Sequence, residues 1–245
     1  MYKKIVKAKY SHRIDSDDLS IKFEPKIEFS KRDFDFTVKQ KKIIERLISE
    51  RTNVVFLSGP AGCTKTYLSI YAALRLLQEN VAESLMYIRT VVESGDRNVG
   101  TLPGSHEEKL MPYSMPLDDK LFEILKPQTY THIKNQKDII ECIPVNYLRG
   151  RNWEDKIVVF DEAQNATFKE LTTALTRIGE NTKLFICGDA MQSDINGKSG
   201  FSEMMSLFTN QDASEHGIYC YEFDESDIKR SPLVRYIVET ISQKR

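Results

Sequence analysis

Short apolar runs alternate with amphipathic helical patterns along most of this chain. Strand-like runs of apolar and β-branched residues lie at 54–57, 84–89, 157–165, 183–187 and 218–223. Strands that alternate with helices predict right-handed crossovers, a mainly parallel sheet and helices on both of its faces. We therefore expect a three-layer α/β fold with the strand 54–57 in the middle of the sheet.

The first residues have a different pattern of charged and apolar positions. Residues 1–32 carry separate groups of lysines and aspartates with little periodicity, which predicts an arm outside the core, either solvated or in contact with RNA. Residues 33–245 are expected to form one domain. Thr37 and Gln40 have the spacing of a capping box ahead of an apolar helix face, so we expect a helix to begin near Thr37.

Prolines and polar residues interrupt the pattern between residues 106 and 145. Residues 106–125 have a helical pattern that contains Pro112 and Pro116. Because proline lacks a backbone donor, we expect two short helices broken at these positions. The polar segment 130–137 predicts a hairpin tip or a protrusion, and residues 138–145 predict a short strand.

One motif joins the strand 54–57 to the helical pattern 67–77. Its residues are Gly59, Pro60, Ala61, Gly62, Cys63, Thr64, Lys65, Thr66 and Tyr67. A glycine-rich loop between a strand and a helix is the context of a P-loop, in which backbone N–H groups and the helix dipole hold the β-phosphate of a nucleotide. Lys65 would reach the β- and γ-phosphate oxygens, and the Thr66 hydroxyl would ligate Mg²⁺.

Thr64 departs from this motif, because a glycine usually precedes the P-loop lysine. A β-branched residue is stiff and crowds the backbone near the phosphates, so we expect the change to affect hydrolysis more than nucleotide binding. A glycine-rich turn without a ligand is the alternative interpretation.

A second motif lies in the strand predicted at 157–165, whose apolar run 157–160 ends in the adjacent carboxylates Asp161 and Glu162. Residues just past the carboxyl ends of parallel strands face the ligand crevice of an open sheet. Asp161 would hold the Mg²⁺ that bridges the phosphates, and Glu162 would orient and deprotonate the attacking water. The plain alternative is an acidic pair stabilised by a helix dipole.

A third strand, 183–187, runs into Gly188, Asp189 and then Gln192. This spacing would bring the Gln192 amide to the crevice, where it could sense the γ-phosphate or position water. Taken alone, a Gly-Asp pair is ordinary turn chemistry.

Composition narrows the class of protein. The 245 residues are 40% hydrophobic and 29% charged, which excludes wholesale disorder, and no apolar run reaches the length of a membrane-spanning helix. The four cysteines lack C-x-x-C spacing, which argues against a zinc site and for a reducing, cytoplasmic compartment. Since the net charge is −1, any nucleic-acid surface must be a local patch.

Several segments together resemble one family. They are RTVVESGDRNVGTLPG (89–104), YLRGR (147–151), FDEAQN (160–165), LTRIG (175–179), GDAMQSD (188–194) and DIKRSPLVRYIVE (227–239). In this order they are similar to the PhoH family of P-loop ATPases, over residues 36–239. The resemblance implies a RecA-like core, ATP and Mg²⁺ binding, ring-shaped homo-oligomers and action on RNA. Short versions of this kind are frequent in bacteriophages, whose proteins act in the host cytoplasm.

The resemblance also gives further residues a second interpretation. Gln40 becomes an adenine reader as well as a capping residue, and the two roles are hard to combine. Arg177 becomes a candidate arginine acting on a neighbouring subunit, although a cation near a helix C-terminus also has a plain structural role.

For three more arginines the sequence leaves more than one role open. Arg149 and Arg151 flank a glycine and could hold nucleic-acid phosphates, complete a neighbour's ATP site or lie in a solvated turn. Arg230 precedes a final helical pattern at 233–241 and is the preferred second sensor of the γ-phosphate, ahead of Arg235.

The function expected from these patterns is Mg²⁺-dependent ATP hydrolysis coupled to RNA or single-stranded nucleic acid in a ring, with a hexamer implied by the resemblance. An ATP-binding assembly or regulatory protein with a protein client is the alternative. A P-loop kinase is disfavoured, because Glu162 beside a metal-binding aspartate suits water activation.

Overall fold

The computed structural model describes Phe29, residues 31–90, 106–134, 138–148, 152–190, 192–193, 195 and 197–228, and the helical positions 233, 236, 237 and 240. The strands are β1 Val54–Ser58, β2 Ser84–Arg89, β3 Ile140–Pro144, β4 Lys156–Asp161, β5 Lys183–Gly188 and β6 Ile218–Glu222. The α-helices are α2 Val38–Ile48, α3 Lys65–Gln78, α4 His106–Ile124, α5 Pro127–Lys134, α6 Phe168–Leu175, α7 Phe201–Leu207 and α8 Gln211–Glu215.

All six strands join one sheet in the order β3-β2-β4-β5-β1-β6, and every pairing between them is parallel. This confirms the predicted α/β fold with a parallel sheet. The position of the P-loop strand was predicted wrongly, because β1 lies next to the edge strand β6 and not in the middle. Strand order is set by where each crossover docks, and local apolar patterns do not encode that choice.

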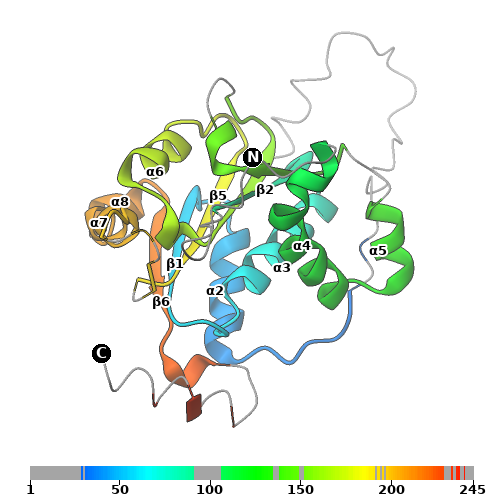
Figure 1. The fold of residues 1–245 in the computed structure, drawn as a ribbon, viewed down its shortest axis with the longest axis horizontal. Helices are drawn as coiled ribbons and strands as arrows, with labels where there is room; N and C mark the ends of the chain where they lie inside the picture. The colour runs from blue at the N-terminus through cyan, green and yellow to red at the C-terminus, as the bar shows by residue number, and fades with distance from the viewer. Residues whose placement is uncertain are drawn as a thin grey trace, which may run out of the picture.

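Helices cover both faces of the sheet, with α2, α3, α4 and α5 on one side and α6, α7 and α8 on the other (Figure 1). Alternate residues of each strand point to opposite cores. In β1, for example, Val55 and Leu57 belong to the core under α3, whereas Val54 and Phe56 belong to the core under α7. Burial on both faces explains why the strands are continuous apolar runs. No helix among the described residues is long and apolar enough to cross a membrane.

Helix α2 begins as the sequence predicts. The Thr37 hydroxyl accepts from the Gln40 backbone N–H at 3.2 Å, and the Gln40 side-chain oxygen accepts from the Thr37 N–H at 2.9 Å. This reciprocal pair is a complete capping box, which satisfies two backbone donors at the helix start.

The chain begins to pack on the core before residue 33, where the sequence predicted the domain to start. Phe29 is 3% exposed, and the Arg32 backbone N–H donates to the Ile124 carbonyl at 2.7 Å. The core therefore includes Phe29, and exposed Arg32 is bonded to the end of α4, although the sequence assigned both residues to the arm. The remainder of the predicted arm, residues 1–28, lies outside the described residues.

Helix α4 differs from the prediction, because Pro112 and Pro116 lie inside one helix and do not break it into two. A proline within a helix costs about 3 kcal/mol. Leu117, Leu121 and Ile124 are buried in the core shared with α3, and this burial offsets the lost backbone bonds. For residues 130–137 the sequence predicted a hairpin tip or a protrusion. Residues 130–134 instead belong to α5, and residues 135–137 lie outside the described residues.

Candidate functional site

The loop between β1 and α3 requires glycine at two places. Gly59 has φ +151°, and a Cβ there would lie 2.6 Å from the Cβ of Phe223. Gly62 has φ +89°. Both values fall in the region that side chains rarely adopt. The spacing of the motif therefore reflects a tightly folded loop, as a phosphate cradle needs.

Thr64 occupies a left-handed conformation, with φ 70° and ψ 14°. This is the backbone shape that makes glycine usual at the position, so the loop has adopted its geometry with threonine in place. The Thr64 hydroxyl donates to the Cys63 carbonyl at 2.6 Å and accepts from the Gln40 side-chain amide at 2.9 Å.

Lys65 begins helix α3 and folds back onto the loop. Its ammonium donates to the carbonyl oxygens of Gly59 at 2.6 Å and Pro60 at 2.9 Å. The first N–H groups of an α-helix have no acceptor within the helix, so they and the Lys65 ammonium are suited to bind an anion. Cys63 is fully buried, and burial raises the pKa of its thiol.

Thr66 and Asp161 meet although they are 95 positions apart in the chain. The Thr66 hydroxyl donates to the Asp161 Oδ1 at 2.7 Å, and the Tyr87 hydroxyl donates to Asp161 Oδ2. Burial, followed by the Asp161 charge, raises the pKa of Tyr87, so this phenol stays protonated. Two hard oxygen ligands in contact at the end of a P-loop fit a Mg²⁺ ion.

Glu162 is held in a strained turn directly after β4. Its φ of 54° and ψ of 38° are left-handed, which costs a non-glycine residue about 1–2 kcal/mol. The Thr90 hydroxyl donates to the Glu162 carbonyl, and the Gln164 amide donates to the Glu162 carboxylate at 2.6 Å. Such strain persists where surrounding contacts fix it, often at functional sites.

Arg89 is a site residue that the sequence analysis assigned no role. From the end of β2 its guanidinium lies 3.7 Å from the Asp161 carboxylate and 3.7 Å from the Glu162 carboxylate. Burial alone would lower the pKa of Arg89, but Tyr87 and Asp161 raise it, so the side chain stays charged. Its only sequence signal is its place at the carboxyl end of a strand.

Gln164 links the turn after β4 to the end of β5. Its side-chain oxygen accepts from the Asp189 backbone N–H at 3.0 Å, while its amide holds Glu162. Gln192 follows on the exposed rim of the same loop. Gln192 lines the same cleft, and its role toward a phosphate stays a prediction.

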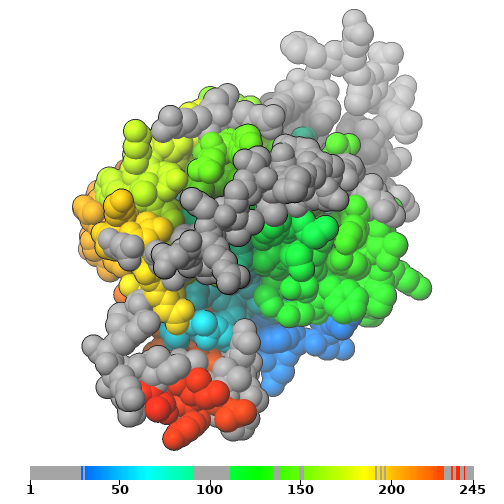
Figure 2. All heavy atoms as spheres, in the orientation of Figure 1, coloured from blue at the N-terminus to red at the C-terminus, as the bar shows by residue number. Residues whose placement is uncertain are grey.

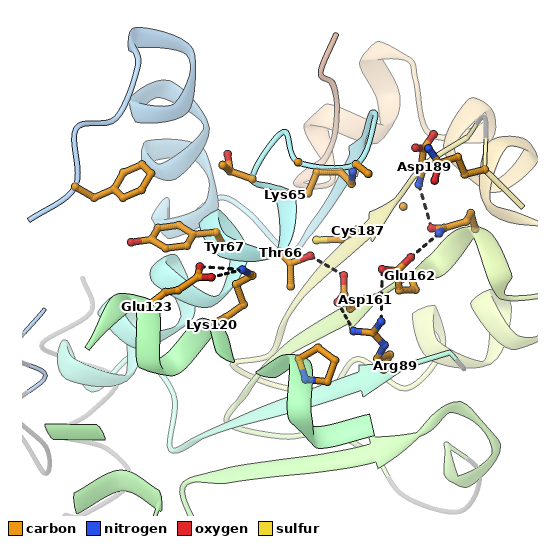
Figure 3. Close-up of a pocket in the computed structure, with 18 residues that line it drawn as sticks. Lys65, Thr66, Tyr67, Arg89, Lys120, Glu123, Asp161, Glu162, Cys187 and Asp189 are labelled. Carbon is orange, nitrogen blue, oxygen red and sulfur yellow. Dashed lines mark hydrogen bonds and ion pairs between the residues drawn. The ribbon is translucent and has the colours of Figure 1, made fainter. Parts of the chain in front are cut away.

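These residues surround a cleft of about 510 Å³. Its lining includes the loop residues Ala61, Gly62, Thr64, Lys65, Thr66 and Tyr67. In Figure 2 the cyan atoms after β1 reach the surface between the yellow atoms after β5 and the green atoms of α4. Figure 3 shows Thr66 between the carboxylates on one side and Tyr67, Lys120 and Glu123 on the other. The volume is in the range of small-molecule sites.

Gln40 does not meet the expectation of an adenine reader. It is 1% exposed, and its two side-chain polar atoms bond to Thr37 and Thr64. The structure therefore shows the capping role, with an added bond to the P-loop.

Arg177 was expected on the crevice side, in the last turn of a helix. The structure places it elsewhere on both counts. Helix α6 ends at Leu175, and the Arg177 carbonyl accepts from the Trp153 N–H just before β4. This places Arg177 at the amino ends of the strands, across the sheet from the cleft. A role for Arg177 in the ATP site of a neighbouring subunit stays a prediction. Arg149, Arg151, Arg230 and Arg235 lie outside the described residues.

Comparisons with known proteins show which family this sequence resembles. The sequence model described as PhoH-like protein matches residues 35–242. The PhoH-like protein of Bacillus subtilis (strain 168) is 36% identical over 197 residues, which cover 80% of this chain and 60% of that protein. Protein PhoH of Escherichia coli (strain K12) is 31% identical over 196 residues, which cover 79% of this chain and 54% of that protein. The chain thus spans between 54% and 60% of these relatives.

A solved structure, "Sulfolobus solfataricus SWI2/SNF2 ATPase core in complex with dsDNA", matches with a TM-score of 0.47 at 16% identity, covering 84% of this chain and 48% of that chain. The RecA-like character of the fold rests on the sheet order and the P-loop described above. Since the family's sequence model matches most of its length, the chain belongs to the PhoH family.

Proposed function

We propose that this protein binds and hydrolyses ATP with Mg²⁺ in the cleft, and couples hydrolysis to RNA or single-stranded nucleic acid as an oligomeric ring. The observation that carries the ATPase proposal is the contact between Thr66 and Asp161, 2.7 Å apart, with Lys65 and Glu162 lining the same cleft. A P-loop hydroxyl and a strand-end carboxylate in contact are what a metal–triphosphate site needs.

Each residue has a separable task in this proposal. The start of α3 and the Lys65 ammonium bind the phosphates, for which Lys65 must leave the carbonyls of Gly59 and Pro60. Thr66 and Asp161 would hold Mg²⁺, which when bound neutralises phosphate charge. Arg89 neutralises the carboxylates and orients Glu162.

Glu162 acts as general base. Its carboxylate takes a proton from water as the water oxygen bonds to the γ-phosphorus, and the bond from that phosphorus to the bridging oxygen breaks, leaving ADP and phosphate. The 39% exposure of the Glu162 side chain lets water reach it, and the Gln164 amide keeps one carboxylate oxygen in place. Phosphoryl transfer depends on such positioning.

Two variants test the ATPase proposal. Lys65→Ala is expected to abolish nucleotide binding, because a positive charge at the phosphates is lost. Glu162→Gln is expected to keep binding and lower turnover by about two to four orders of magnitude, since only the base is removed. Lys41→Ala, an exposed lysine on α2, is the matched control. Near-normal turnover in Glu162→Gln would refute the assignment.

Coupling to nucleic acid is supported by the family resemblance and by Arg149 and Arg151. An RNA-stimulated ATPase assay, with gel filtration in the presence and absence of ATP, tests the coupling and the ring.

An assembly or regulatory ATPase with a protein client is the second candidate. Thr64 favours it, because a threonine at the glycine position is expected to slow turnover. ATP-dependent assembly without RNA stimulation would support this second candidate.

A further inference from the structure

The cleft continues beyond the P-loop, away from the carboxylates, to an end that the proposed chemistry does not use. This end is lined by Phe34, Tyr67 and the α4 residues Lys120 and Glu123. In Figure 3 it lies across Thr66 from Asp161 and Glu162. A triphosphate with its γ-phosphate at the carboxylates would direct the remainder of the nucleotide toward this end.

We propose that the nucleobase stacks on the ring of Phe34, and that stacking on this ring, not edge recognition by Gln40, holds the base. This inference rests on the proposed binding of a nucleoside triphosphate. Tyr67 directly follows Thr66 at the start of α3, so its ring forms the wall between the phosphates and Phe34.

The ring of Phe34 is fixed on one side and open on the other. Its centroid lies 4.7 Å from that of Tyr67 and 4.6 Å from that of Phe36. Phe36 and Tyr67 are 9% and 6% exposed, whereas Phe34 is 38% exposed. A large apolar ring that is held by buried neighbours and faces a cleft is a preformed stacking surface for a planar ligand.

The backbone that carries Phe34 is also anchored. The Arg32 N–H donates to the Ile124 carbonyl at 2.7 Å, and the Arg32 guanidinium donates to the Leu125 carbonyl at 3.1 Å. These bonds attach the segment to the end of α4, the helix that supplies Lys120 and Glu123. The stacking surface and the polar residues beside it therefore belong to one packed unit.

The Gln40 side chain is already engaged and does not recognise the base. Its side-chain oxygen and amide are committed to Thr37 and Thr64, and it is 1% exposed. Lys120 and Glu123 pair with each other at 2.8 Å with partly exposed side chains. Such a pair offers one donor and one acceptor on flexible stems, which suits the edges of adenine and of guanine alike. We expect the affinities for ATP and GTP to differ by less than about tenfold.

The test measures direct binding by calorimetry with Mg²⁺, using ATP, GTP and inorganic triphosphate as probes. Phe34→Ala is expected to lower the affinity for ATP and for GTP by about tenfold or more, in line with the loss of one base–aromatic stack. Its binding of inorganic triphosphate is expected to stay within about twofold of the wild-type protein, because that probe has no base. Phe34→Tyr should retain nucleotide affinity.

The control is Phe168→Ala, which removes a phenylalanine that is 37% exposed on α6 and does not line the cleft. Equal losses for ATP and inorganic triphosphate in Phe34→Ala would overturn the proposal, since Phe34 would then support the loop itself. Unchanged ATP affinity in that variant would overturn it as well. A wild-type protein that binds neither triphosphate nor nucleotide would instead refute the proposed function.

Discussion

The Gln40 side-chain amide donates a hydrogen bond to the Thr64 hydroxyl at 2.9 Å, which ties the cap of α2 to the phosphate loop. The same glutamine closes the capping box with Thr37. Thr64 has a left-handed backbone that costs a β-branched residue about 1–2 kcal/mol. A side-chain hydrogen bond contributes about 1 kcal/mol, so the bond to Gln40 offsets a large part of this cost.

Thr64→Gly is therefore expected to leave ATP affinity within about tenfold, since glycine adopts the same backbone without strain. Turnover is expected to rise, because the side chain that crowds the phosphates is gone. The measurements are equilibrium ATP binding and steady-state hydrolysis. Thr64→Ser is the control, because it keeps a hydroxyl for Gln40. Loss of ATP binding in Thr64→Gly would mean that the bound loop differs from the loop described here.

The elements that carry the motifs were predictable because their signals are local. The run 54–57 is apolar throughout and forms a strand buried on two faces. Of the strand predicted at 157–165, the residues up to Asp161 form β4, and residues 163–165 form a short 3-10 helix instead. The capping box of Thr37 and Gln40 also depends only on residues three apart. Such features need no knowledge of the distant chain.

The errors concern relations between distant segments. The position of β1 next to an edge depends on β5 docking between β4 and β1. Pro112 and Pro116 remain inside α4 because tertiary burial of Leu117 and Leu121 outweighs local propensity. Arg89 was given no role, since only the pairing of β2 with β4 brings its side chain to Asp161.

Arg89→Ala is expected to lower turnover by about a hundredfold, in the range found when one preorganised charge is removed from a site. Without its guanidinium, Asp161 and Glu162 repel each other, and the Glu162 carboxylate is left with the Gln164 amide among the partners described above. The Kd for ATP should change by less than about tenfold, because Lys65 and the start of α3 remain.

The matched control for Arg89 is Arg75→Ala, which removes an arginine paired with Glu79 on the far end of α3. That variant should behave as the wild-type protein. Arg89→Lys distinguishes charge from geometry, since lysine keeps the charge but lacks the fork that spans two carboxylates. Full activity in Arg89→Ala would remove this residue from the site.

Lys183 makes the stability of the fold depend on pH. Its ammonium donates to the carbonyls of Ser49 at 2.8 Å and Thr52 at 2.5 Å, and burial lowers its pKa to about 8. Between pH 8 and the ordinary lysine pKa of 10.5, the unfolded chain binds more protons at this residue than the folded chain. The contribution of Lys183 to the free energy of unfolding therefore rises across this window, by at most about 1.4 kcal/mol per pH unit.

Denaturant titrations of the wild-type protein and Lys183→Met between pH 7 and pH 10 test this dependence. The difference in the free energy of unfolding should shift in favour of the wild-type protein as the pH rises above 8. Lys41→Met, at an exposed position on α2, is the matched control. A constant difference for Lys183→Met would contradict the lowered pKa.

The predicted ring would place the cleft of one subunit opposite Arg177 of the next. The cleft lies at the carboxyl ends of the strands, and Arg177 lies at their amino ends. A head-to-tail contact would set these opposite surfaces of two subunits against each other, and repetition of that contact closes a ring when the rotation permits. A cation from a neighbouring subunit at the cleft would add to the positive charge that stabilises the transferred phosphoryl group.

Mixing two inactive variants tests this arrangement. Glu162→Gln subunits and Arg177→Ala subunits are each expected to be inactive, because each lacks one half of a shared site. In an equal mixture about a quarter of the boundaries would join an intact glutamate to an intact arginine, so partial activity should return. A double variant mixed with either single variant should stay inactive. A monomer with full activity at all concentrations, or an active Arg177→Ala protein, would show that Arg177 does not act on a neighbouring site.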